Sequence, residues 1–258
     1  MAIELYNDGQ HKCLAFGDLV KGEGIQSNQF LIIDGEHEAL IDPGGELTFT
    51  SLSTEVNREV GLKGLDYICA SHQDPDIISS VPSWISRTNA QIVSSVLWSR
   101  FLPHLVPQYM GDRISERCIC VPDAGMDLTL GKSTIKVLPG HFLHSVGNLQ
   151  FYDVRAKILF SGDMGANLVA EGAENPVTTV EEFDKLLPSM QGFHRRYMVS
   201  NKVCRFWANM VRGLDMDMMV PQHGRSLKGR AVIDRFLDWI ANLQCGIDLM
   251  TQDNYRVP

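Results

Sequence analysis

The residues best suited to chemistry in this chain form the run His72-Gln73-Asp74-Pro75-Asp76-Ile77. This run places one imidazole and two carboxylates at alternate positions, directly after an apolar segment over residues 65–70. Imidazole nitrogens and carboxylate oxygens together form a ligand set for hard to borderline metal ions. Pro75 disfavours a helical conformation for the residue before it, so Asp74 is expected to be extended. The segment therefore predicts a metal site at the end of a strand.

The same arrangement, an apolar segment that ends at a ligand-type residue, recurs along the chain. Residues 134–138 lead to His144, residues 158–160 lead to Asp163, and residues 218–220 lead to His223. Strand ends along one rim of a sheet sandwich can converge on a single site. We therefore expect these side chains to lie near His72.

The elements that must position these residues follow from hydrophobic periodicity. Short or alternating apolar runs predict strands over residues 13–16, 29–33, 38–41, 65–70, 90–94, 126–130, 134–138, 149–154, 158–160 and 218–220. Helical spacing of apolar residues predicts helices over residues 48–61, 79–87, 96–102, 179–191 and 202–213. Intermixed strands and helices predict an α/β fold.

Composition and charge narrow the class of protein. The 258 residues, 44% hydrophobic and 21% charged, are typical of a soluble globular protein. A formal net charge of −8 argues against nucleic acid or an anionic membrane as the main partner. The apolar runs are too short to span a bilayer, and the first residues lack the features of a signal peptide. No long linker divides the chain. We expect one cytoplasmic domain over residues 1–258.

The order HxDxD, His, SGD and PQHG resembles the metallo-β-lactamase fold, and specifically its diiron branch, the flavodiiron proteins. In that branch the first motif is HxExDH, followed by LHW, a bridging aspartate and a final SHG. Here Leu143-His144-Ser145 matches the first two letters of LHW, Asp163 follows 19 residues after His144, and residues 221–224 match the last motif. Residues 206–211 (FWANMV) also resemble the YYANI helix of that family. The likeness covers roughly residues 1–230 and implies an α/β, metallo-β-lactamase-type αββα sandwich.

The resemblance also implies a ligand set for two iron ions. Its members are three histidines and three aspartates: His72, Asp74, Asp76, His144, Asp163 and His223. The first iron would take His72, Asp74 and His144, and the second would take Asp76 and His223. Asp163 would bridge the pair.

Two positions depart from the family pattern. Asp74 stands where the family has glutamate, and Ile77 stands where it has a histidine available to the second iron. Ile77 cannot coordinate a metal, so the second iron is expected to be the more open of the two. The mixed nitrogen and oxygen set favours iron or manganese, whereas a dizinc hydrolase of this fold would usually be richer in histidine. Zinc stays the alternative metal.

Other candidate residues receive less specific interpretations. His141 competes with His144 for the third motif, and the Leu-His match and the step to Asp163 favour His144. His141 is then expected to support the ligands from behind or to gate the pocket. Taken alone, Asp42 is expected to be a turn carboxylate. The resemblance implies a structural or ligand-supporting aspartate at this position, so Asp42 is left out of the ligand set. His11, His37, His104 and His194 have no ligand-like context and are expected at the surface or in turns.

Flavodiiron enzymes reduce dioxygen or nitric oxide with electrons from a flavin in an attached flavodoxin-like domain. Only 35 residues follow His223, and no phosphate-binding loop opens a helix after a strand. We therefore expect no flavodoxin domain and no FMN in this chain.

Three functions are considered on this basis. The favoured one is a stand-alone diiron protein that binds dioxygen, or nitric oxide, and reports it to a signalling protein. The second is an O2 or NO reductase subunit fed by a separate redox partner, which would make the protein an oxidoreductase. The third is a dizinc metallo-hydrolase that uses a metal-bound hydroxide. A homodimer is compatible with each of them.

Overall fold

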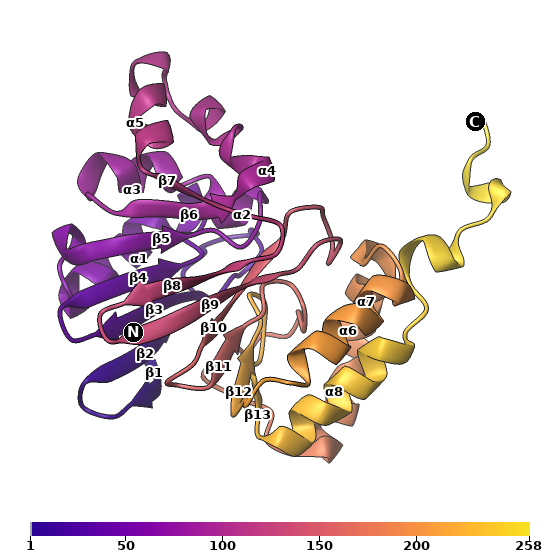
Figure 1. Ribbon diagram of the computed structural model, residues 1–258. Coiled ribbons are helices and arrows are strands. Elements are labelled where there is room, and N and C mark those ends of the chain that lie inside the picture. Colours follow the sequence, from indigo (N-terminus) through magenta and orange to yellow (C-terminus); the bar gives the residue numbers. More distant parts are fainter. Residues whose placement is uncertain (1) are drawn as a thin grey trace.

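Two β-sheets packed face to face, with helices on both outer sides, make up the computed structural model, which describes residues 2–258 (Figure 1). Hydrophobic side chains of both sheets form one shared core between them. On the outer face of each sheet, a further apolar layer joins that sheet to the helices that cover it. This arrangement confirms the predicted α/β class and the αββα order of layers.

The first sheet contains, within residues 2–258, seven strands side by side in sequence order. They are β1 (Ile3–Asn7), β2 (His11–Phe16), β3 (Gln29–Asp34), β4 (His37–Ile41), β5 (Leu65–Cys69), β6 (Gln91–Ser95) and β7 (Cys118–Val121). Strands β1 to β4 are antiparallel, and β4 to β7 are parallel. Because β4 and β5 are parallel, the segments that follow them, including the His72 run, leave the sheet at the same edge.

The second sheet has the order β13-β12-β11-β10-β9-β8 in the described part of the chain. Its strands are β8 (Met126–Leu130), β9 (Ser133–Pro139), β10 (Leu149–Asp153), β11 (Ile158–Phe160), β12 (Met218–Val220) and β13 (Leu227–Lys228). Strand β10 is antiparallel to β9 and β11, and β11 is parallel to β12. Strands β9, β11 and β12 therefore run in one direction, and their carboxyl ends lead to His144, Asp163 and His223.

Helices cover the outer face of each sheet (Figure 1). Those that follow strands of the first sheet are α1 (Glu46–Glu59), α2 (Pro75–Ile78), α3 (Val81–Arg87), α4 (Val96–Ser99) and α5 (Gly111–Glu116). The long helices α6 (Val180–Tyr197), α7 (Asn201–Val211) and α8 (Arg230–Asn242) cover the second sheet. Short 3-10 helices lie at Leu62–Gly64, Leu102–Leu105, Gln108–Met110, Gly246–Leu249 and Gln252–Asn254. Across residues 2–258, every helix is too short or too polar to cross a membrane.

Alternation along the strands explains why the layers form. In β3, Phe30 and Ile32 join the core between the sheets, while Leu31 joins the layer beneath α1 and α3. In β11, Phe160 faces the first sheet and Leu159 packs in the layer of α6 to α8. Successive strand residues point to opposite faces, so a run of apolar residues can serve two cores at once.

Helix α6 is longer than the sequence pattern predicts. The pattern places a helix over residues 179–191, but the helix continues to Tyr197 past Pro188. A capping box formed by Thr179 and Glu182 begins it, and Met190 and His194 keep its buried face continuous after the proline. Helix α8 was not predicted, although its buried residues follow a helical spacing.

The expectation that His11 and His194 lie at the surface is wrong, because both are fully buried. His11 lies 2.7 Å (Nε2) from an oxygen of Asp153 and 3.1 Å (Nδ1) from an oxygen of Asp34. His11 is in β2 of the first sheet and Asp153 is in β10 of the second. The interaction therefore ties the two sheets together at a buried point.

We expect His11→Ala to lower the free energy of unfolding by about 3–5 kcal/mol, because it leaves the buried carboxylate of Asp153 without its charged partner. The exposed pair of His37 and Asp66 offers a matched control. His37→Ala should cost about 0–1 kcal/mol, as usual for surface ion pairs. Urea unfolding followed by circular dichroism measures both values. Equal effects of the two substitutions would contradict this account of His11.

The stabilisation by His11 should depend on pH. Burial would lower the pKa of His11, but the hydrogen bonds and charges of Asp153 and Asp34 raise it above its ordinary value. A histidine whose pKa is raised by folding contributes fully below its unfolded pKa of about 6.5. The contribution is lost as the pH rises through the folded-state pKa. The difference in unfolding free energy between wild type and His11→Ala should therefore shrink from about pH 6.5 upward. A difference that stays constant over this pH range would contradict the proposed pH dependence.

Candidate metal centre

Four of the six predicted ligands form one tight group. Nε2 of His144 lies 2.9 Å from Oδ2 of Asp163, and Nε2 of His72 lies 3.6 Å from the same oxygen. Oδ2 of Asp74 is 3.5 Å from His144 Nε2 and 3.8 Å from His72 Nε2. Ligand atoms of all four residues lie within 4.8 Å of one another, close enough to hold one metal ion.

The other two predicted ligands form a second group around the opposite oxygen of Asp163. Nε2 of His223 lies 3.3 Å from Oδ1 of Asp163 and 3.5 Å from Oδ2 of Asp76. Asp163 thus turns Oδ2 to one group and Oδ1 to the other. A carboxylate in this orientation can bridge two metal ions.

The local backbone explains how one short run supplies three of these side chains. His72 follows the end of β5, and Asp74 precedes the first turn of α2 with φ −65° and ψ 146°. This extended conformation is the one predicted from Pro75, which occupies the first position of the helix. Asp76 then lies in the first turn of α2. The bend between strand and helix separates Asp74 from Asp76, so each faces a different group.

Hydrogen bonds behind the histidines orient their Nε2 atoms towards the centre. Nδ1 of His223 lies 2.7 Å from the carbonyl oxygen of Gln26 and must carry the proton to donate there. Nδ1 of His72 lies 2.8 Å from Oγ of Ser71. In both rings Nε2 is left for the centre, which is the usual arrangement of a metal-binding histidine.

Asp42 lies behind His72 rather than in the ligand set. Its Oδ1 accepts a hydrogen bond of 2.8 Å from the backbone N–H of Ser71, and its side chain is buried. Burial raises the pKa of Asp42 to about 6. Asp42 thus does more than close a turn. It holds the segment that carries His72, which agrees with the supporting role that the resemblance implies.

Two atoms at the centre are suited to bind a cation. Nε2 of His72 and Oδ1 of Asp163 are buried and have no hydrogen-bond partner among the described residues. Buried polar atoms are normally paired, and those left over mark an unsatisfied site. Donor atoms that share an ion at about 2.1 Å each are separated by roughly 3 Å, which matches the spacing of these groups. The donor set of three imidazoles and three carboxylates thus fits a pair of metal ions.

The electrostatics of the centre also favour cations. Burial would raise the pKa of Asp163, but His144 and the other neighbouring histidines hold it well below its ordinary value. Burial would lower the pKa of His223, yet Asp163 and the charge of Asp76 raise it to about 9. Without metal, protons on His144 and His223, whose pKa values the neighbouring carboxylates raise despite burial, offset the carboxylate charges. Metal ions would take the place of those protons.

The two groups differ in the number of donors. Among the described residues, the first possible metal position is surrounded by His72, Asp74, His144 and one oxygen of Asp163. The second is surrounded by Asp76, His223 and the other oxygen of Asp163. Ile77 is fully buried in an apolar cluster with Ala70 and Val81. Its side chain belongs to the core under α3 and leaves the second position with fewer ligands.

Cavities open on the side of the second position. One of about 260 Å³ is lined by His223, Ile25 and Leu168, among others. Another of about 240 Å³ is lined by Asp76 and again by Ile25. The two side-chain ligands of the second group thus each border a cavity.

His141 is placed away from the six ligands. Its Nε2 lies 2.9 Å from the carbonyl oxygen of Asp123, and its Nδ1 accepts a hydrogen bond of 3.1 Å from the N–H of Gly147. Both ring nitrogens are used by the backbone, so His141 stabilises the loop that carries His144. His144, and not His141, lies at the centre.

Two aromatic residues of α6 lie next to the centre, and of these Phe193 was not predicted as part of it. The rings of Phe193 and Tyr197 lie edge to face with His144, with centroids 6.4 Å and 6.1 Å away. Their spacing of four residues on one helix was the available signal, since it places both on one face. Tyr152 and Trp207 lie in the core under α6 to α8.

A family model described as "ODP family beta lactamase" matches residues 25–224. Two solved structures of a chemotaxis sensor ODP are similar over nearly the whole of both chains. One, a peroxy diiron species, is 38% identical, covers 98% of this chain and 100% of its own, and has a TM-score of 0.83. The other, the apo state from T. denticola, is 39% identical with 99% of each chain covered and a TM-score of 0.84.

More distant proteins are similar to this chain over part of their own length. A flavo di-iron protein variant from Thermotoga maritima is 19% identical, with a TM-score of 0.73 over 92% of this chain and 60% of that one. An uncharacterized protein of Methanocaldococcus jannaschii is 24% identical over 227 residues, which are 85% of this chain and 54% of that protein. The chain thus spans about half the length of that curated relative.

The metallo-β-lactamase-type fold predicted from the motifs is confirmed by these matches, and the chain belongs to the ODP family of β-lactamase-fold proteins.

Proposed function

We propose that this protein binds two iron ions at the centre formed by His72, Asp74, Asp76, His144, Asp163 and His223, and that it takes up dioxygen there as an oxygen sensor. The observation that carries the proposal is the orientation of Asp163. Its two oxygens face two separate groups of ligands, at 2.9 Å from His144 and 3.3 Å from His223. A centre that holds a single metal ion would not need both oxygens of Asp163.

The relatives support the identity of the metal and of the ligand. The two similar structures are of a chemotaxis sensor, and one of them is a peroxy diiron species. Both match this chain along almost its whole length at 38–39% identity. Ferrous ions, when bound, would supply the electrons that dioxygen accepts.

The surroundings of the second position support a small uncharged ligand. The cavities beside His223 and Asp76 are lined by the carboxylates of Asp18, Glu23, Glu46 and Glu171. Neither lining contains a lysine or arginine among the described residues. Such an acidic approach repels the phosphate or carboxylate groups of common hydrolase substrates but does not repel dioxygen. This disfavours the dizinc hydrolase alternative.

The remaining parts of the proposal concern partners and setting. We propose that the bound state is reported to a signalling protein, as the description of the similar structures as a chemotaxis sensor supports. A cytoplasmic location and a single diiron domain over residues 1–258 belong to the same proposal. The alternative, an O2 or NO reductase subunit fed by a separate donor, uses the same centre and differs in how long the bound gas persists. A homodimer stays a prediction.

Metal analysis tests the ligand set. Protein reconstituted anaerobically should hold about two iron ions per chain, and Asp163→Ala should lose both because it removes the shared ligand and leaves the histidine charges unopposed. His141→Ala should keep the pair, and exposed Asp127→Ala is a control for loss of a carboxylate. One tightly held ion in Asp163→Ala, or near-stoichiometric zinc in place of iron in the wild type, would contradict the proposal.

Spectra recorded before and after oxygen addition test the function. Adding air to the anaerobic diferrous protein should produce a visible absorption band that persists for minutes if the protein is a sensor. Rapid decay of the band with continued oxygen consumption, when a reductant is supplied, would favour the reductase. No change on addition of oxygen would refute dioxygen as the ligand.

A further inference from the structure

His194 of α6 is not part of the ligand set, yet it contacts the segment that carries Asp163. Its Nε2 accepts a hydrogen bond of 3.0 Å from the backbone N–H of Gly165, two residues after Asp163. Its Nδ1 lies 2.8 Å from the carbonyl oxygen of Met190, one turn earlier in α6, and donates there. The two contacts fix both nitrogens of the ring in one tautomer.

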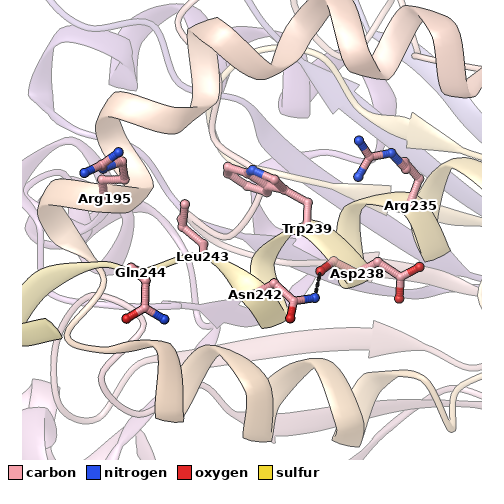
Figure 2. Close-up of a pocket in the computed structure, with 7 residues that line it drawn as sticks. All are labelled: Arg195, Arg235, Asp238, Trp239, Asn242, Leu243 and Gln244. Atoms are coloured by element: carbon pink, nitrogen blue, oxygen red, sulfur yellow. Dashed lines mark hydrogen bonds between the residues drawn. The ribbon is translucent and has the colours of Figure 1, made fainter. Parts of the chain in front are cut away.

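The packing around His194 holds the ring in place. Phe193 and Trp239 lie edge to face with it at centroid distances of 5.3 Å, and Phe236 lies 6.2 Å away. Trp239 also lines a surface groove of about 550 Å³ along α8, where Figure 2 shows its indole between Arg195 and Arg235. His194 is thus enclosed beneath this groove. Burial lowers its pKa to about 4, so the ring stays neutral and Nε2 stays an acceptor.

Gly165 depends on this acceptor. Its φ is +98°, and a Cβ at this position would lie 2.7 Å from the end of the Met219 side chain, so Gly165 packs closely against this residue of β12. A buried N–H without an acceptor costs about 1–3 kcal/mol. Removing the acceptor therefore favours a shift of the segment that contains Asp163.

A second residue, Asn167, binds the carbonyl group of Gly165. The side-chain N–H of Asn167 donates to the carbonyl oxygen of Gly165 at 3.0 Å, and also to that of Arg225 at 3.1 Å. The backbone N–H of Asn167 donates to the carbonyl oxygen of His223 at 3.0 Å. Asn167 thus joins the Asp163 segment to the His223 segment, and His194 joins the same segment to α6.

We propose that His194 is a positioning residue for the metal centre. Acting through Gly165, it fixes the direction of the Asp163 carboxylate, so that each oxygen faces its own group of ligands. This inference rests on the proposed role of Asp163 as the shared ligand. The same end of α6 carries Phe193 and Tyr197 against His144, so the helix supports two ligands from two different strands.

Two substitutions of similar size separate the hydrogen bond from packing. His194→Gln keeps an oxygen that can accept from Gly165, whereas His194→Leu fills the space without an acceptor. Anaerobic titration with ferrous iron should show affinity for the pair reduced by about 10–100-fold in the leucine variant and largely restored in the glutamine variant. Titration with Co²⁺ should show altered visible bands in the leucine variant, because these bands report ligand geometry.

Ile240→Ala is the control for stability alone. Ile240 is a fully buried residue of α8 in the same hydrophobic layer. This variant should unfold more easily but bind metal with unchanged affinity and spectrum. If the leucine variant does not fold, His194→Met replaces it, since a flexible thioether fills the same space.

The outcomes distinguish this inference from the proposed function. Wild-type affinity and spectrum in the leucine or methionine variant would overturn the role of His194 while leaving the diiron centre intact. Equal loss in the glutamine and leucine variants would also overturn it, because the acceptor would then be irrelevant. Failure of the wild type itself to bind a pair of ions would instead refute the proposed function.

Discussion

Burial of the Asp163 carboxylate is the constraint on which the rest of the structure depends. The residue is only 5% exposed, and an isolated carboxylate in such surroundings is strongly disfavoured. Its charge is offset by three imidazoles that reach it from three different segments of the chain. Burial would lower the pKa of His223, but Asp163 and the charge of Asp76 raise it to about 9, so a proton on this imidazole offsets the carboxylate charge when no metal is bound. Metal ions supply the same compensation without protons, so the fold and the metal centre share one electrostatic requirement.

The topology meets this requirement by bringing strand ends together. Strands β9, β11 and β12 run in one direction in the second sheet, and β5 of the first sheet delivers the His72 run to the same place. The loops must then pass very close to one another. Gly224, directly after His223, has φ +79°, and a Cβ there would lie 2.2 Å from the carbonyl oxygen of Asn167. A side chain at this position would force the His223 segment away from Asp163.

From the sequence we could predict local structure that is set by neighbouring residues. We could not predict the burial and contacts of residues whose partners lie far along the chain. The strand that ends before His72 and the extended conformation of Asp74 follow from local pattern and from Pro75. The burial of His11 could not be predicted, because its partner Asp153 lies 142 residues away in the other sheet. His194 was missed for the same reason, since its acceptor role depends on how α6 packs on the loop after β11. Helix α8 did carry a signal, in the spacing of Val232, Phe236 and Ile240.

The two proposed metal positions have unequal numbers of ligand side chains because one short segment contributes both to the centre and to the core. Helix α2 begins at Pro75, so Asp76 turns towards His223 while Ile77, the next residue, turns into the apolar cluster beneath α3. A histidine at position 77 would have to leave this cluster or bring a polar ring into it, at a cost in burial. The isoleucine instead contributes to the core and leaves the second position short of a ligand, next to the cavities that open beside His223 and Asp76. The smaller ligand number at the second proposed metal position and the stability of the adjacent core thus have the same structural origin.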